Sequence, residues 1–317
     1  MWRVFLLGDD LMKYDKSALS FEQQTQRLLD RGLIVSDRDQ LLNCLRSVNY
    51  YRLSAYWLHF KRVDPTTGEE RFAPGTRFND IWRLYTFDHK LRLLIMDSIE
   101  HVEVCILRTR LVEKFTLTYG PFGYKQKENL CPDIPVDKFH RWTQELDEAI
   151  ARSKEEFLEG FKKTYPEERD IPFWIAVEVM SFGQLFTFFR YLNRKEKQEI
   201  AYEFHLYPPV MESWLNTLNF VRNACAHHAR LWNRELPIRP VIPDERHHPE
   251  WYNPVTFSNG RIFAVLTLLR YLLGFITPAQ AWQEQLGQLL REYPEIPIQS
   301  MGFPENWCEC PIWKPTS

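Results

Sequence analysis

The stretch IWRLYTFDHKLRLLIMDSIEHVEVCILRTRL, residues 81–111, decides the fold class of this 317-residue chain. Its apolar residues recur at intervals of three and four, which is the spacing of one face of an α-helix. Asn79 or Thr76 can cap its start, and no Gly or Pro interrupts the pattern before Gly120-Pro121. The pattern predicts a helix of about 35 residues, roughly 50 Å long at 1.5 Å per residue. A helix of this length is typical of the spine of a helical bundle.

Helical patterns dominate on both sides of this stretch. Ser20 and Gln23 form a capping-box pattern ahead of a helix that Gly32 ends, and a second helix begins near Ser36 or Asp37. A third, aromatic-rich helix begins near Tyr50. Further helices are predicted over 138–165, 174–192 with a bend at Gly183, 195–205, 210–230, 259–275 and 278–292.

Loops punctuate these helices where Pro and Gly gather, at 64–68, 120–136 and 237–254. Alternating strand patterns are scarce, so the predicted fold is all-α. We expect a smaller N-terminal helical lobe over 1–70, a main helical bundle over 71–292, and an irregular, proline-containing tail over 293–317.

The composition excludes several classes of protein. Hydrophobic residues make up 44% and charged residues 26%, which is ordinary for a globular protein. The net charge of −2 excludes a strongly cationic nucleic-acid binder but allows a local basic site. Six cysteines show no secreted framework, and the apolar run Val4–Leu7 is too short for a signal peptide. The apolar stretch 262–276 contains Arg270 and is too short to span a bilayer, so we expect a cytoplasmic protein without membrane contact.

The chemically informative segment is ESWLNTLNFVRNACAHHARLWNR, residues 212–234. An apolar stripe runs along its predicted helix, and polar residues gather at its C-terminal end. From 214 to 240 there are four Arg against one Glu, which makes this part of the chain a local basic spot. The polar cluster consists of Arg222, Asn223, His227, His228, Arg230 and Arg234.

Arg222 and His227 have the chemistry that RNA cleavage needs. A 2′-hydroxyl beside its own phosphate is a built-in nucleophile, so a proton shuttle and a cation suffice. His can transfer protons near neutral pH, and Arg can hold phosphate oxygens. On a helix the two lie five residues apart, about 140° around the axis, so they do not share a narrow face. Because Arg is long, both could still reach one groove, or a second protomer could complete the groove. Alternatively, Arg and His at a helix C-terminus merely satisfy its carbonyls and dipole.

The segment Arg222–His227 matches the Arg-x4-6-His motif of the HEPN superfamily of helical ribonucleases. The longer run through Arg234 resembles the signature of the Abi-like family of bacterial abortive-infection proteins. Other segments resemble that family in the same order: Asn49–Trp57, Ile81–Leu111 with Leu84-Tyr85-Thr86-Phe87-Asp88, Tyr119–Phe122, and Pro172–Glu178 with Ser181-Phe182-Gly183.

This resemblance implies a HEPN-like helical core, a homodimer in which two motifs face each other, and metal-independent RNA cleavage without a cofactor. It also implies a phage-defence or toxin role, in some members controlled by a small RNA. Arg222 and His227 would be the catalytic pair, with Asn223 and His228 as supporting polar groups. The RNA substrate does not follow from the resemblance.

Other sites remain open at this stage. Cys225, His227 and His228, with His247-His248 or Cys308 and Cys310, could suggest zinc, but the spacing departs from paired zinc ligands, and we predict no metal site. Asp97, Glu100 and Glu103 lack the Glu-x-x-His partner of a di-metal bundle, so we expect ion pairs with Arg108 or the motif arginine. No Gly-x-Ser-x-Gly or Walker-type loop is present.

A non-catalytic RNA-binding protein is the second functional hypothesis. Residues 50–62 interleave aromatic and basic side chains, among them Tyr51 and Arg52, which could stack on bases and contact phosphates. With Arg230 and Arg234, these residues are the predicted RNA contacts. The same aromatics could instead fill the core of an amphipathic helix. A small inhibitory or guide-like RNA bound here would make the protein part of an RNA-held complex.

Overall fold

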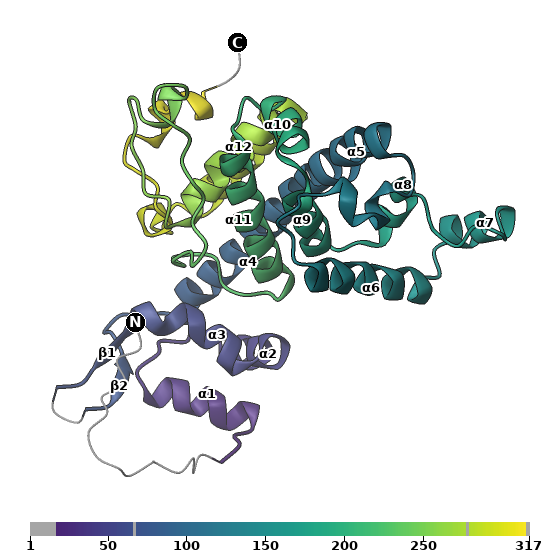
Figure 1. Cartoon of the computed structure of the whole chain (residues 1–317). Coiled ribbons are helices and arrows are strands. Elements are labelled where there is room, and N and C mark those ends of the chain that lie inside the picture. The colour runs from purple at the N-terminus through teal and green to yellow at the C-terminus, as the bar shows by residue number, and fades with distance from the viewer. Residues whose placement is uncertain (1–16, 66–67, 277–278, 315–317) are drawn as a thin grey trace, which may run out of the picture. The chain divides into compact units, whose positions relative to one another are not determined.

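The computed structural model describes residues 17–65, 68–276 and 279–314 (Figure 1). The chain divides into two compact units, Met1–Tyr85 and Thr86–Ser317. Over the described ranges, the sheet content is one pair of three-residue strands and helices supply the rest of the regular structure. The predicted all-α class is therefore confirmed. The divisions predicted after residues 70 and 292 stay predictions.

The first unit begins with three short helices, α1 (Phe21–Asp30), α2 (Arg38–Val48) and α3 (Tyr50–Trp57). The predicted capping box is present, since Ser20 Oγ accepts from Gln23 N at 3.2 Å and Gln23 Oε1 accepts from Ser20 N at 2.8 Å. A hairpin that the sequence did not predict follows, with β1 (Lys61–Val63) antiparallel to β2 (Glu70–Phe72). Three residues are too few to show an alternating pattern. Residues 66–67 of the predicted loop lie outside the described residues.

The long helix predicted from residue 81 runs without a break to Tyr119, but its central turns are not α-helical. It consists of α4 (Phe78–Val102), a π-helical segment (Glu103–Arg110) and α5 (Leu111–Tyr119), and Gly120 ends it at φ 77°. Ile106 and Leu107 are buried, and so are Leu111 and Val112 five residues later. That interval fits the i→i+5 bonding of a π-helix, which is rare and frequent at functional sites.

Two helices predicted as single segments are divided. The span 138–165 forms α6 (Val136–Arg152) and α7 (Glu156–Thr164), because Ser153 turns to an extended backbone. The span 174–192 forms α8 (Phe173–Ala176) and α9 (Phe182–Tyr191). The break falls at Ser181, not as a bend at Gly183, because Ser181 and Gln184 form a capping box that starts a new helix. The next helix, α10 (Arg194–Tyr202), follows the prediction closely.

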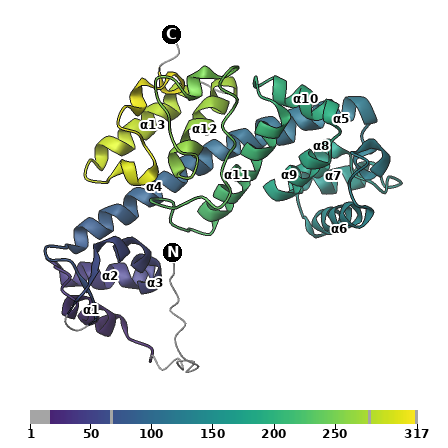
Figure 2. The ribbon, with the colours of Figure 1, turned by 60° about the vertical axis from the view of Figure 1, so that its left-hand side comes forward.

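The C-terminal part contains α11 (Pro208–Ala226), α12 (Ile262–Ile276) and α13 (Ala279–Glu292), and Figure 2 shows α12 and α13 side by side. Arg270 is buried in α12, and its Nε donates to Gln283 Oε1 at 2.9 Å. The tail packs on α12 through Trp313, whose Nε1 donates to Thr267 Oγ1 at 3.1 Å. No helix within the described ranges is long and apolar enough to cross a membrane.

Candidate active site

Helix α11 is packed firmly into the protein and leads to the predicted catalytic pair at its C-terminal end. Pro208 and Pro209 occupy its first two positions, where a missing N–H costs nothing, so they start this helix as well as ending the previous segment. The predicted stripe of Trp214, Leu218, Val221 and Cys225 is buried. Trp214 Nε1 also donates to Val241 O at 2.8 Å, which ties the helix to the loop that follows it.

The helix ends at Ala226, four residues before the predicted end, in a Schellman arrangement. His228 N donates to Cys225 O at 2.8 Å, and Ala229 N donates to Ala224 O at 2.8 Å. This closure requires a left-handed residue, and His228 takes that conformation at φ 55° where Gly is usual. His227 and His228 therefore lie at the turn that ends the helix, and both are exposed.

A buried carboxylate fixes the chain directly after this turn. Asp88 of α4 is fully buried, and its Oδ1 accepts from Leu231 N at 3.0 Å and from Trp232 N at 2.6 Å. Arg92, one turn further along α4, forms an ion pair with the same carboxylate and is 4% exposed. Asp88 thus holds the segment that follows the motif, a role that the sequence could not assign.

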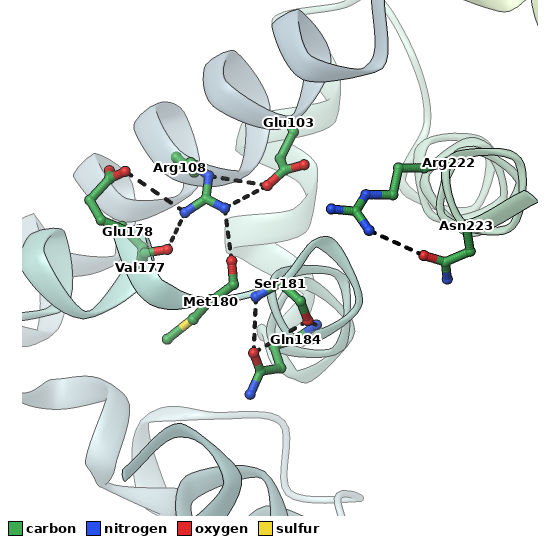
Figure 3. Close-up of polar contacts among 9 residues, drawn as sticks. All are labelled: Glu103, Arg108, Val177, Glu178, Met180, Ser181, Gln184, Arg222 and Asn223. Atoms are coloured by element: carbon green, nitrogen blue, oxygen red, sulfur yellow. Dashed lines mark hydrogen bonds and ion pairs between the residues drawn. The ribbon is translucent and has the colours of Figure 1, made fainter. Parts of the chain in front are cut away.

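Arg222 is half-buried, and its guanidinium is available for an anion. Its one hydrogen bond within the described part of the chain is a long contact from Nη1 to Asn223 Oδ1 at 3.5 Å. No carboxylate of the described residues pairs with it, so the predicted partnership with a carboxylate of the long helix is not found. Figure 3 shows Arg222 extending from α11 toward Glu103 and the Ser181–Gln184 cap of α9.

The neighbouring arginine, Arg108, is saturated with partners. Its Nη2 donates to Glu103 Oε1 at 2.6 Å and to Met180 O at 2.8 Å, and its Nη1 donates to Val177 O (Figure 3). The predicted Glu103–Arg108 ion pair is therefore confirmed, whereas Asp97 and Glu100 are exposed. Because Arg108 binds the two carbonyls ahead of Ser181, it fixes the start of α9 next to Arg222.

His227 and Arg222 are near each other in the chain but do not interact directly. No hydrogen bond joins their side chains, and His227 makes no side-chain hydrogen bond within the described ranges. A spacing of five residues corresponds to about 140° around an ideal helix, which predicts that the two side chains lie on different sides of the end of α11.

The other predicted RNA contacts are divided between the units. Arg230 and Arg234 follow α11, and the Arg234 guanidinium lies 5.2 Å from the ring centroid of Phe220. Tyr51 and Arg52 belong to α3 in the first unit, and Tyr51 is 83% exposed. The neighbouring Tyr56 and Trp57 are buried, so these two aromatic residues of the stretch serve the core.

The residues of the zinc alternative do not converge. Among the described residues, no three His, Cys, Asp or Glu side chains come together as ligands for a metal. Cys225 lies in the apolar core, and burial raises the pKa of its thiol to about 12, which disfavours the thiolate that zinc requires. Cys308 is exposed while Cys310 is buried, so their thiols do not share one environment.

Asn219 is a second residue that the sequence analysis did not single out. It lies on α11 one turn before Arg222, and its Oδ1 is buried without a hydrogen-bond partner in the described chain. A Cβ added to Gly183 of α9 would lie 3.7 Å from this oxygen, so Asn219 faces the start of α9. The signal available in the sequence was the run of Asn216, Asn219 and Asn223 at helical spacing.

The fold and the site together define an all-α protein in which a buried helix ends on an Arg-x4-His sequence with both side chains accessible. A family model described as Abi-like protein matches residues 43–233, more than half of the chain, and the chain belongs to that family. No curated protein and no solved structure matches it. The matched segment contains Asp88, the π-helical segment, Arg222 and His227.

Proposed function

We propose that this Abi-like protein is a metal-independent endoribonuclease of the HEPN type that acts in phage defence, with Arg222 and His227 as its catalytic residues. The observation that carries the proposal is that both side chains lie at the end of a rigid helix without a carboxylate partner in the described chain. An arginine kept only for structure would resemble Arg108, which donates to one carboxylate and to two backbone carbonyls.

The reaction uses the substrate's own nucleophile. The 2′-oxygen attacks the adjacent phosphorus, the 2′-hydroxyl proton leaves to a base, and the bond to the 5′-oxygen breaks as that oxygen takes up a proton. His227 moves the protons, and Arg222 stabilises the charge that develops on the phosphate oxygens. The products carry a 2′,3′-cyclic phosphate and a 5′-hydroxyl. Asn223 and His228 are supporting polar groups beside this pair.

A second copy of the chain completes the site in this proposal. The spacing of Arg222 and His227 predicts that they lie on different sides of the end of α11, and we propose that one protomer does not place both on the same phosphate. In a homodimer with two facing motifs, Arg222 of one protomer and His227 of its partner act together. Mixing inactive Arg222→Ala protein with inactive His227→Ala protein then restores cleavage, because one of the two sites in each mixed dimer is intact. An absence of restored activity in proven mixed dimers contradicts the shared site.

The direct test is cleavage of RNA by purified protein in EDTA, after removal and sequencing of any RNA that co-purifies. We expect Arg222→Ala and His227→Ala to lose about 10²–10⁴-fold in rate. The exposed Arg169→Ala and His140→Ala serve as matched controls and keep wild-type rates. Equal cleavage by all variants, or none by the wild type, overturns the proposal. Retained RNA binding without cleavage favours the RNA-binding alternative, with Tyr51 and Arg52 as contacts.

A further inference from the structure

A row of three neighbouring cavities follows α9 on the surface of the second unit. Its largest part is a cavity of about 1020 Å³ between α9, α10 and α11. Arg190 and Glu212 line both this cavity and a neighbouring one of about 270 Å³. Lys138 and Thr187 line the second cavity and a third of about 410 Å³. The shared lining residues make the three cavities neighbours in a row along α9, and we name this row the α9 groove.

The α9 groove is more basic than the chain as a whole. Arg194, Lys138 and Arg141 line it, and none has a carboxylate within 4.0 Å among the described residues. The Glu212 carboxylate forms ion pairs with two other cations, at 3.1 Å from Lys197 Nζ and 3.4 Å from Arg190 Nε. Asp133, Glu145 and Glu212 line the groove against five cations, which leaves a net charge of +2 on a chain of net charge −2 and favours an anionic ligand.

Aromatic rings line one end of the groove. Tyr202 and Tyr207 belong to its wall at α10 and α11, and they are 50% and 41% exposed. Their ring centroids lie 6.2 Å apart. Exposed rings beside unpaired cations are the combination that binds single-stranded nucleic acid, because rings stack on bases while cations contact phosphates.

The opposite end of the groove leads to the proposed catalytic arginine. Ser181, Gly183 and Gln184 line it there. Gly183 faces Asn219 of α11, and Arg222 lies one turn further along that helix, directed toward the same cap (Figure 3). The ten residues of α9 span about 15 Å along the groove.

We infer that the α9 groove binds a short single-stranded RNA segment and leads the adjoining phosphate to Arg222. Arg194, Lys138 and Arg141 contact phosphates, and Tyr202 and Tyr207 stack on bases at the far end. The inference rests on the proposed ribonuclease function, for which it supplies the substrate-binding surface.

The test measures binding separately from cleavage. A fluorescent RNA oligonucleotide with 2′-O-methyl groups lacks the nucleophile, so its anisotropy reports binding alone. The variant K138E/R141E/R194E reverses three groove charges, and K154E/K163E/R169E makes the same change of charge at exposed sites that line no part of the groove. We expect Kd to rise about tenfold or more for the groove variant alone. For the groove variant, the slope of log association constant against log salt concentration should become about 2 less steep, at roughly 0.7 for each of three lost phosphate contacts.

Cys131 supplies a readout of position. This free cysteine lines the groove, whereas the exposed Cys308 does not. Bound oligonucleotide should slow alkylation of Cys131 and leave that of Cys308 unchanged, as measured by mass spectrometry of the peptides. The same protection in Arg222→Ala protein shows that the groove binds RNA whether or not the chain cleaves it.

Two results would overturn the inference. Equal weakening of binding by both triple variants shows that only overall charge matters, and undiminished alkylation of Cys131 at saturating RNA shows that the strand lies elsewhere. Cleavage that persists with either result rejects the groove but leaves the proposed function standing. Groove binding without cleavage by the wild type retains the groove as an RNA site and rejects the nuclease.

Discussion

Replacing Asp88 with Ala should destabilise the second unit more than a typical surface substitution does. The carboxylate is fully buried, accepts from Leu231 N and Trp232 N, and pairs with Arg92, which is itself 4% exposed. Its removal leaves a buried guanidinium without that charge partner and two backbone donors without their acceptor. We expect a loss of about 3–5 kcal/mol in the free energy of unfolding. At roughly 2–4 °C per kcal/mol, the melting temperature falls by about 6–20 °C.

Urea denaturation and hydrogen exchange together test this reasoning. The double variant Asp88→Leu/Arg92→Met should recover much of the stability, because an apolar pair replaces the buried ion pair. In this double variant, the Leu231 and Trp232 amides should exchange as fast as they do in Asp88→Ala, because they still lack the carboxylate as an acceptor. Asp97→Ala, an exposed change on the same helix, should stay within about 0.5 kcal/mol of wild type. If Asp88→Ala also stays within 1 kcal/mol, the anchoring role is refuted.

Two further predictions concern titratable groups. Burial alone would raise the pKa of Glu203, but hydrogen bonds from Lys114 and Arg110 lower this pKa overall. The stabilising effect of the Glu203 carboxylate is therefore present above the unfolded pKa of 4.5 and is lost as the pH falls through the lower folded pKa. The loss of stability in Glu203→Gln, measured by urea denaturation, should therefore shrink as the pH falls below 4.5. A loss of stability that grows in acid would contradict this direction. Glu199→Gln, which replaces an exposed carboxylate 3.9 Å from Lys195, is the control. In the folded protein near pH 8, the exposed Cys308 should be alkylated well before Cys225, because Cys225 is 4% exposed and has a thiol pKa of about 12. Equal rates of alkylation would show that the end of α11 opens readily.

Local signals predicted most helices because they depend on neighbouring residues. The capping box at Ser20 and the apolar rhythm of α12 are examples of signals that need no tertiary information. The capping box at Ser181 was also legible, yet the apolar run across it concealed the break between α8 and α9. The π-helical turns were missed because Ile106-Leu107 and Leu111-Val112 also fit a loose α-helical pattern.

The candidate site was less predictable than the helix that carries it. Sequence placed Arg222 and His227 at the end of a helix, and the structure agrees. It could not show that His228 adopts the left-handed conformation, since Gly or Asn is usual there. It also could not show that Asp88 binds the backbone of Leu231, because the two residues are 143 positions apart in the chain.

The precision of the proposed site originates in the long helix more than in α11 itself. Asp88, on α4, holds the backbone that follows the motif, while Arg108, in the π-helical segment, holds the carbonyls that precede α9. The first anchor follows the end of α11, which carries Arg222, and the second precedes the start of α9. The i→i+5 geometry places Glu103 beside Arg108, five residues later, so the pair can brace α9 from one side. A site held by polar contacts at both ends keeps its geometry without a ligand, which is the preorganisation that the proposed metal-independent cleavage requires.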